Sequence, residues 1–219
     1  MELSGKESEI LLDAEAYAKE KLTGESTGHD WWHVKRVADG ARSIAKEAAA
    51  DGFICVLAAL LHDLADEKVC GDEAQGLAEI SCWMQTNGVE QAEREHVAEI
   101  VSTMSFKGGG RPAMRTIEGM VVQDADRLDA IGAMGIARVF VYSGAKGRPV
   151  HDPGVVAREV MTLEEYRSGR DTAINHFYEK LLKLKELMNT PAGRRRAEGR
   201  HRFMEQYLEQ FYSEWDGRL

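Results

Sequence analysis

The sequence predicts an all-α protein, and three observations carry the prediction. Apolar residues recur at spacings of three and four along most of the 219 positions, which is the period of a helix with one buried face. A period-two alternation with branched residues, typical of a half-buried strand, persists nowhere in the sequence. Apolar residues make up 43% of the chain, enough to fill a sizeable core. We therefore expect a single helical domain with a C-terminal helical extension.

Glycine and asparagine divide the first two thirds of the chain into helices. The expected helices are residues 8–22, 30–50, 53–66, 71–87, 89–104, 117–131 and 132–142. The second should be capped by Asp30, Ser26 or Thr27, because such side chains accept hydrogen bonds from first-turn amides. The sixth should be capped by Thr116 for the same reason. The third stands apart, since an unbroken apolar run at 53–61 predicts a helix buried on nearly every side.

The last third of the chain is less regular. Residues 143–169 contain several glycines and prolines and should form a long excursion with one short helix at 155–166. Helices are expected again at 171–188 and from Thr190-Pro191 toward the C-terminus, because proline is favoured in a first helical turn.

The same periodicity predicts which side chains face the core. Those expected to be buried include Ala74, Leu77, Ile80, Met84, Ala92, Val97, Ile100, Val101, Ile117, Met120, Val121, Leu128, Ile174, Phe177, Leu181, Leu184, Met188, Met204, Leu208 and Trp215. In the helix at 117–131, Asp124, Asp126 and Asp129 lie among small and apolar neighbours. At least one of these aspartates should therefore point inward.

Charge and cysteine content exclude several classes of partner. The formal net charge is −9, which argues against a nucleic-acid polymer as the main ligand but not against a small phosphorylated substrate. The three cysteines show no CxxC spacing and cannot all pair, which indicates a reducing compartment and no cysteine-based zinc site. The N-terminus lacks a signal pattern, and the longest apolar run is too short to span a membrane. We therefore expect a cytoplasmic protein with no membrane partner.

The apolar third helix ends in the ionisable residues His62, Asp63, Asp66, Glu67 and Lys68. Ionised groups are costly inside a protein unless they are paired or bound to metal. A His-Asp pair at the end of a buried helix is therefore a candidate metal site. The alternative is a helix end that frays into solvent, where these charges are simply hydrated.

Two further polar residues lie in apolar settings, His33 in the second expected helix and Asp126 in the sixth. With His62 and Asp63 they provide two imidazoles and two carboxylates. That set suits Mn²⁺, Fe²⁺, Co²⁺, Ni²⁺ or Mg²⁺ in octahedral geometry, with two positions left for water and substrate. His33 could instead be a hydrogen-bonded core histidine, and the aspartates could form a solvated face.

The order His, His-Asp, Asp resembles the HD superfamily of metal-dependent phosphohydrolases, and the likeness extends well beyond these residues. Four segments look like the YpgQ/YedJ-like branch of that superfamily: residues 29–34 (HDWWHV), 61–68 (LHDLADEK), 122–138 (VQDADRLDAIGAMGIAR) and 175–182 (NHFYEKLL). The resemblance covers nearly the whole chain and implies an HD-domain helical bundle. We divide that fold into an N-terminal helix at 1–22, a metal-binding core at 23–142, and a loop excursion with C-terminal helices at 143–219 that pack on the core.

The resemblance also implies a cofactor and a reaction. One divalent metal ion, with Mn²⁺ expected first, would be held by His33, His62, Asp63 and Asp126. Members of this branch hydrolyse nucleoside triphosphates to monophosphate and pyrophosphate, so the implied partner is a small phosphorylated substrate, a nucleotide. A homodimer is left open.

Acidic residues beside the ligands are candidates for catalysis together with Asp63. Glu67 follows Asp63 by four residues on the same helical face, so it could orient or deprotonate the attacking water. Asp66 could support the imidazole of His62, and the two acids could exchange roles.

Three cations are candidates to offset the charge of a substrate phosphate: Lys68, Arg127 and Lys107. Lys68 and Arg127 could equally form ordinary ion pairs with Asp66 and Asp129. Lys107 lies in a glycine-rich loop that could be a plain surface connector.

Other functions remain open at this level. One is a different phosphohydrolase activity, either 5′-nucleotidase or phosphodiesterase, including the type that acts on guanosine tetraphosphate. Another is a nucleotide or metal sensor without turnover. The third is a structural helical domain whose His and Asp residues are core hydrogen-bonders.

Overall fold

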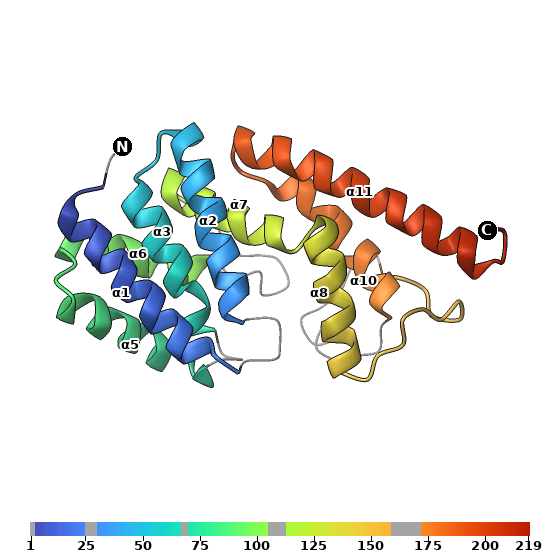
Figure 1. Ribbon diagram of the computed structural model, residues 1–219, viewed down its shortest axis with the longest axis horizontal. Helices are drawn as coiled ribbons and strands as arrows, with labels where there is room; N and C mark the ends of the chain where they lie inside the picture. Colours follow the sequence, from blue (N-terminus) through green and yellow to red (C-terminus); the bar gives the residue numbers. More distant parts are fainter. Residues whose placement is uncertain (1–2, 25–29, 67–69, 105–112, 159–171) are drawn as a thin grey trace. The chain divides into compact units, whose positions relative to one another are not determined.

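The computed structural model describes residues 3–24, 30–66, 70–104, 113–158 and 172–219, and these ranges are helical with no strand, which confirms the all-α prediction (Figure 1). The chain divides into two compact units, unit 1 at Met1–Asp126 and unit 2 at Arg127–Leu219. Each unit is described by itself. The domain bounds proposed from the sequence, 1–22, 23–142 and 143–219, stay predictions.

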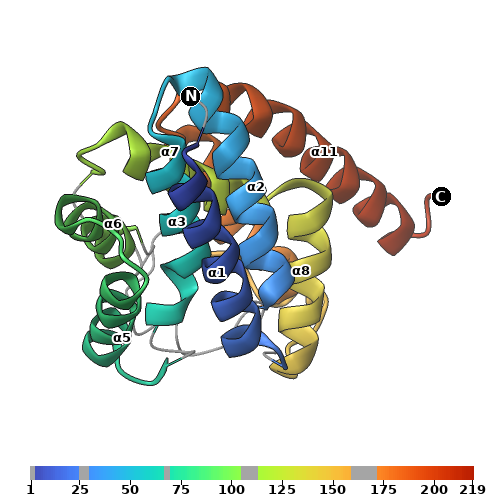
Figure 2. The same cartoon turned by 60° about the vertical axis from the view of Figure 1, so that its left-hand side comes forward.

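Unit 1 is built around a central apolar helix. Its elements are α1 (Gly5–Leu22), α2 (Trp31–Ala48), α3 (Gly52–Leu61), the 3-10 turn η1 (His62–Ala65), α5 (Glu73–Thr86), α6 (Gln91–Thr103) and the larger part of α7 (Ile117–Asp129). Every side chain at positions 53–61 is buried, as the apolar run predicts. α1 and α2 lie alongside α3, and α6 packs on it from another side with α5 beside it (Figure 2).

Helices of unit 1 begin where capping side chains allow. Asp30 accepts a hydrogen bond from the amide of His33 at 2.8 Å, so the predicted cap of α2 is confirmed. Asp51 caps α3 by accepting from the amide of Phe53 at 2.8 Å. Thr116 accepts from the amide of Gly119 at 3.2 Å, which confirms the predicted start of α7.

Unit 2 consists of three shorter elements and one long helix, α11. The elements are α8 (Gly132–Ala145), α10 (Ala173–Glu179), the 3-10 helix η2 (Leu181–Leu187) and α11 (Pro191–Trp215). α8 and η2 both contact α11, and α10 contacts α8 (Figure 1). α8 starts at Gly132, where φ is +73° and an added Cβ would lie 2.9 Å from the side chain of Arg200. Only glycine meets both conditions without strain.

Two expected helices of unit 2 are wrong in part. The helix predicted at 171–188 is broken at Lys180, whose φ of −136° and ψ of −58° end α10 before η2 begins. Its apolar stripe is nevertheless buried as predicted, from Ile174 to Met188. Residues 155–158, the start of the short helix predicted at 155–166, are not helical, and the remainder lies outside the described residues.

Four residues expected in the core are exposed instead, and all lie in the first or last turn of a helix. These are Ala74, Ala92, Ile117 and Trp215. Periodicity assigns a side chain to a helix face, but a terminal turn can project past the neighbour that would cover it. Interior stripe residues such as Ile80 and Val97 are buried as expected.

None of the described helices alone is long and apolar enough to cross a membrane, and only the bent pair α7 and α8 passes that test of length and composition when taken together.

Candidate metal centre

Two polar side chains, His62 and Asp63, directly follow the buried helix α3. The α-helix ends at Leu61, and the chain tightens into η1, whose first residues are His62 and Asp63. The sequence predicts an unbroken helix to about residue 66, so the tightening is a finding of the structure. Adjacent residues on a helix diverge by about 100° or more. The two side chains converge nonetheless, with Nε2 of His62 3.1 Å from Oδ1 of Asp63.

His33 approaches the same point from the first turn of α2. Its side chain is 2% exposed, and its Nε2 lies 3.4 Å from Oδ2 of Asp63. The same Nε2 lies 3.4 Å from Oδ1 of Asp126, which α7 supplies. The rings of His33 and His62 meet edge to face with centroids 5.4 Å apart. Donor atoms of His33, His62 and Asp63 all lie within 4.8 Å of one another, as one ion requires.

The aspartates of α7 have separate environments. Asp124 is fully buried, and Asp129 is buried with an ion pair to Arg138 at 2.8 Å. The prediction that at least one aspartate points inward is therefore confirmed. The side chain of Asp126 is 35% exposed, whereas those of the three residues it joins are at most 6% exposed. The cluster is thus buried on three sides and reaches solvent beside Asp126.

The electrostatics of the cluster favour a positive charge at its centre. Burial alone would lower the pKa of His62, but the adjacent carboxylate of Asp63 and the charge of Asp126 outweigh it and raise that pKa to about 9. Desolvation opposes ionisation of Asp126, yet the hydrogen bond from His33 and the charge of His62 lower its pKa to about 2. Two carboxylates and two imidazoles fit a divalent cation in the same place.

The tautomer of His62 is fixed from the backbone. Its Nδ1 lies 2.8 Å from the carbonyl oxygen of Ala59, which can only accept, so Nδ1 carries the proton. In the neutral ring, the form that binds a metal ion, the lone pair is therefore on Nε2, which is buried and, within the described part of the chain, has no partner of hydrogen-bond geometry. This is the arrangement that metal-bound histidines usually show. Sequence analysis missed the role of Ala59, because a backbone carbonyl leaves no signal in residue type.

The structure describes only some of the residues predicted to take part in catalysis or substrate binding. Glu67, Lys68 and Lys107 lie outside the described residues. Asp66 is half-buried in extended backbone just past η1. Arg127 follows Asp126 on α7 and donates from Nη1 to the carbonyl of Leu187. The catalytic and substrate-binding roles of these residues stay predictions.

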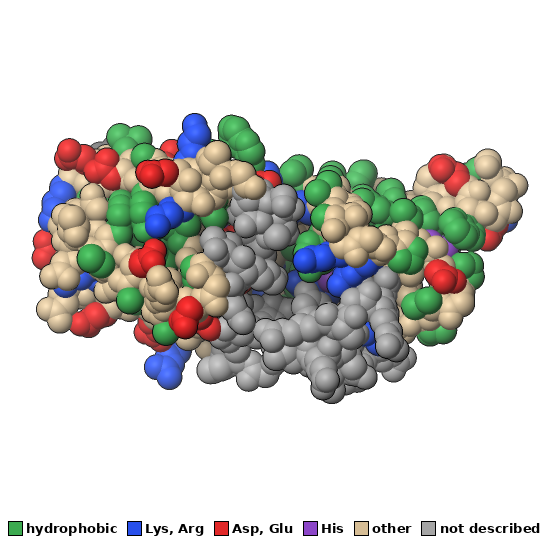
Figure 3. Space-filling view, turned by 90° about the horizontal axis from the view of Figure 1, so that it is seen from below, with side chains coloured by type: hydrophobic (Ala, Val, Ile, Leu, Met, Phe, Trp, Pro, Cys, Tyr) green, Lys and Arg blue, Asp and Glu red, His purple; other side chains and the backbone are tan. Residues whose placement is uncertain are grey.

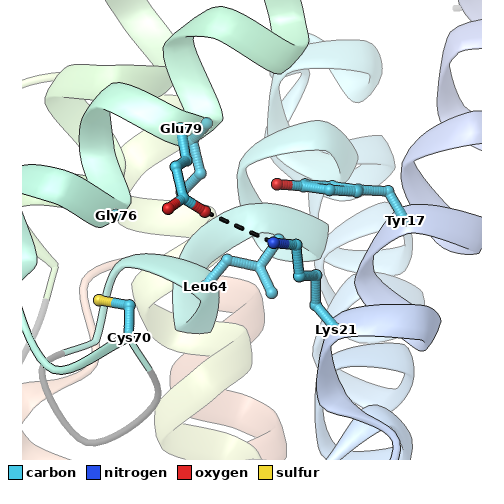
Figure 4. Close-up of a pocket in the computed structure, with 7 residues that line it drawn as sticks. Tyr17, Lys21, Leu64, Cys70, Gly76 and Glu79 are labelled. Atoms are coloured by element: carbon cyan, nitrogen blue, oxygen red, sulfur yellow. Dashed lines mark hydrogen bonds and ion pairs between the residues drawn. The ribbon is translucent and has the colours of Figure 1, made fainter.

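A small cavity of about 230 Å³ lies beside η1 (Figure 4). It is lined by Tyr17, Lys21, Leu64, Cys70, Gly76, Glu79 and Ile80. At its wall, α5 packs so closely on η1 that a Cβ on Gly76 would lie 2.8 Å from Cα of Ala65. The backbone of α5 therefore supports the turn that carries His62 and Asp63.

Comparison with known proteins gives consistent matches. A family model described as the HD domain matches residues 31–131, a span that contains the four clustered residues. The protein YpgQ of Bacillus subtilis (strain 168) is 42% identical over 198 residues, which are 90% of this chain and 89% of that protein. The crystal structure of YpgQ in complex with ADP matches with a TM-score of 0.76 at 38% identity, covering 93% of this chain and 97% of that chain.

Two other solved structures are similar over nearly their whole length. One, from Lactobacillus plantarum, has a TM-score of 0.83 at 39% identity and covers 95% of this chain and 98% of that chain. The other, an HD-superfamily hydrolase from Bacillus thuringiensis, has a TM-score of 0.77 at 44% identity and covers 96% and 98% respectively.

Proposed function

This chain belongs to the HD superfamily of hydrolases, and from that premise we propose that it is a metal-dependent phosphohydrolase that converts nucleoside triphosphates to monophosphate and pyrophosphate. Water adds to the α-phosphorus, and the bond from that phosphorus to the α,β-bridging oxygen breaks. Pyrophosphate leaves, and the water proton passes to a base of the protein.

One observation carries the proposal. Side chains from α2, η1 and α7, distant in sequence, converge with His33 Nε2 at 3.4 Å from both Asp63 and Asp126. Ordinary core histidines bond to one or two neutral partners, whereas here two imidazoles share two carboxylates. We propose that His33, His62, Asp63 and Asp126 hold one divalent cation, with Mn²⁺ as the first choice for this donor set.

The bound cation would neutralise charge on a phosphoryl oxygen and lower the pKa of a coordinated water. The chain's own residues provide the geometry. The Ala59 carbonyl fixes the ring of His62, and the packing of α5 on η1 fixes the backbone of Asp63. We assign Glu67 to orient and deprotonate the attacking water, with Asp66 as the alternative base. Lys68, Arg127 and Lys107 are proposed to offset phosphate charge.

The proposed substrate class draws support from one relative. YpgQ has been crystallised in complex with ADP, which is a nucleotide with a phosphate chain. YpgQ is 42% identical to this chain over 90% of this chain and 89% of YpgQ. A nucleotide is therefore the substrate that we test first.

The experiment incubates metal-stripped protein, reloaded with Mn²⁺, with a mixed nucleotide pool and identifies the products by mass spectrometry. We expect monophosphate and pyrophosphate, with loss of turnover in His62→Ala. His96→Ala is the matched control, because His96 bonds to Thr116 at 2.9 Å, away from the cluster. Thermal unfolding without metal should show that both variants still fold cooperatively.

Other products would redirect the proposal. Free phosphate from monophosphates would indicate a 5′-nucleotidase, and cleavage of diesters a phosphodiesterase. Tight nucleotide binding by the Mn²⁺-loaded protein without any product would indicate a sensor. Unchanged Mn²⁺ content in folded His62→Ala would contradict the metal site itself.

A further inference from the structure

The cavity beside η1 lies within unit 1, and the proposed metal centre uses none of the side chains that line it. Its wall combines residues of α1, η1 and α5, all of which belong to the same compact unit. The volume is about 230 Å³. A cavity of about 150 Å³ is enough to hold benzene, so this one has room for a somewhat larger molecule.

Two opposite charges face each other in the cavity wall. Nζ of Lys21 lies 3.5 Å from Oε2 of Glu79, and this pair joins α1 to α5 (Figure 4). The two side chains are 48% and 46% exposed. An ion pair of this length and exposure contributes little to stability, so a ligand can take its place at small cost. The hydrogen bond from Gln75 and the charge of Lys21 lower the pKa of Glu79, which therefore stays ionised at neutral pH.

The hydroxyl of Tyr17 is a third polar group of the wall. The ring of Tyr17 stacks on Trp83 with centroids 5.2 Å apart and 12° between the planes, and the ammonium of Lys21 lies 5.6 Å from its centre. Figure 4 shows the hydroxyl beside the pair of Lys21 and Glu79. Within the described part of the chain it makes no hydrogen bond. Burial raises the pKa of Tyr17, so the hydroxyl stays protonated and can donate to a ligand.

The rest of the wall is mainly apolar. Leu64 on η1 and Ile80 on α5 are 7% and 1% exposed, and both line the cavity. The thiol of Cys70 already has backbone acceptors, the carbonyl oxygens of Asp66 at 3.3 Å and of Asp72 at 3.1 Å. The groups that the cavity offers to a ligand are therefore one carboxylate, one ammonium, one hydroxyl and an apolar surface.

These groups fit a molecule that carries both charges. A simple anion would be repelled by Glu79, and a simple cation by Lys21. On the face of unit 1 seen in Figure 3, Lys and Arg side chains lie among those of Asp and Glu, so that face has no field of one sign to favour either. A ligand with a carboxylate, an ammonium and an apolar tail satisfies every part of the wall.

We propose that this cavity binds a small zwitterion with an aliphatic tail, the class to which free aliphatic amino acids belong. The ligand's carboxylate accepts hydrogen bonds from Lys21 and Tyr17, and its ammonium donates to Glu79. Its tail packs on Leu64 and Ile80. The site goes beyond the proposed reaction and does not rest on it, because it uses neither the metal centre nor a nucleotide.

Titration calorimetry of the full-length protein, with EDTA present and without nucleotide, tests the site. The probes are the free amino acids leucine, isoleucine, valine and methionine, and we expect at least one to bind. Isoamylamine is leucine without its carboxylate, and isocaproate is leucine without its ammonium. Each should bind at least about tenfold more weakly than leucine, since one charge-assisted contact is lost and one charge of the wall is left without its partner.

Variants locate the binding in the cavity. Lys21→Met and Glu79→Gln should each weaken amino-acid binding at least about tenfold, because each removes one charge contact. Lys6→Met is the matched control for Lys21, since Lys6 is also on α1 and pairs with an acid at 3.1 Å outside the cavity. Glu95→Gln is the control for Glu79, because Glu95 accepts from Gln91 at 2.9 Å on α6. Thermal unfolding checks that every variant is folded.

Each outcome decides for or against the site. Selective loss of binding in Lys21→Met and Glu79→Gln supports it. Absence of binding by folded wild-type protein, with every one of the amino acids, would overturn it. So would an equal loss in the two control variants, because only net charge would then matter. Equal affinity for leucine, isoamylamine and isocaproate would overturn the assignment of a zwitterion.

Discussion

The ring nitrogen Nδ1 of His62 lies 2.8 Å from the carbonyl oxygen of Ala59, one turn earlier in the chain. This bond joins the candidate metal centre to α3, whose side chains at positions 53–61 are all buried. Because the carbonyl only accepts, it keeps a proton on Nδ1 and leaves Nε2 on the side of Asp63, 3.1 Å from its Oδ1, as the nitrogen that a metal ion can bind. The bond depends on the turn where α3 gives way to η1, and several consequences can be measured.

Metal binding should release a proton near neutral pH. The pKa of His62 is raised to about 9 by its acidic neighbours, so the metal-free imidazole is largely protonated at pH 7. A cation and that proton compete for the same nitrogen. We expect the affinity for Mn²⁺ to rise with pH up to about 9. Titration calorimetry in two buffers of different ionisation enthalpy gives the number of protons released, and a value of zero would contradict the assignment of His62.

Without metal, stability should fall as the pH rises through the same range. The pKa of His62 is higher in the folded state than its ordinary value of 6.5. Such a group contributes its full stabilisation below pH 6.5, and the contribution is lost between 6.5 and about 9. Urea unfolding of metal-free protein at about pH 6 and about pH 9 measures the change. His62→Gln should reduce the difference between the two values.

Removing the charge of Asp126 should weaken the metal without unfolding the chain. This side chain is partly exposed, so Asp126→Asn retains shape and costs little burial. We expect Mn²⁺ affinity to fall at least about tenfold, in line with losses seen when groups around metal sites are changed. Asp39→Asn is the matched control, since Asp39 pairs with Lys35 on the exposed side of α2. Equal affinity in both variants would remove Asp126 from the ligand set.

Adding one methyl group at Gly76 should disturb the metal centre from a distance. A Cβ there would lie 2.8 Å from Cα of Ala65, so α5 or η1 must shift. We expect Gly76→Ala to destabilise the protein by about 1–3 kcal/mol and to weaken Mn²⁺ binding. Gly199→Ala on α11, where a Cβ meets nothing within 4 Å, should stabilise by about 0.5–1 kcal/mol instead. Parallel urea unfolding and Mn²⁺ titration of the two variants check the contrast.

The pair of Arg158 and Glu179 should make the protein sensitive to acid. The pKa of Glu179 is lowered, since the bonds and charge of Arg158 outweigh burial. Its stabilisation is present above its ordinary pKa of 4.5 and is lost as the pH falls below it. Glu179→Gln should cost about 1–3 kcal/mol at pH 7 and less at low pH. Glu186→Gln, on an exposed pair with Lys185, should change stability by less than about 0.5 kcal/mol.

Much of the fold could be predicted from local pattern. The predicted caps Asp30 and Thr116 are confirmed, because a capping side chain acts within its own first turn. The predicted start of the last helix at Thr190-Pro191 is confirmed too, with Thr190 as its cap. The break at Lys180 was missed, since nothing in residue type around it disfavours a helix. Apolar residues in the first or last turn of a helix were expected to be buried but are exposed. Their burial depends on where the neighbouring helix ends, which local pattern does not report.

The candidate metal centre could also be predicted only in part. Residue type and spacing single out His33, His62, Asp63 and Asp126, because polar groups in apolar stripes need partners. The Ala59 carbonyl and the close approach at Gly76 gave no signal, since both act through backbone atoms.

The sequence by itself determined the helical class, the buried identity of α3 and the set of donor types, because each follows from residue chemistry within a few turns. Only the tertiary structure decided that His33 and Asp126 meet Asp63 at 3.4 Å, and that α3 tightens into η1 at His62. The physical reason is the distance along the chain over which each effect acts. Propensity and capping act over one or two turns, whereas convergence depends on how whole helices pack.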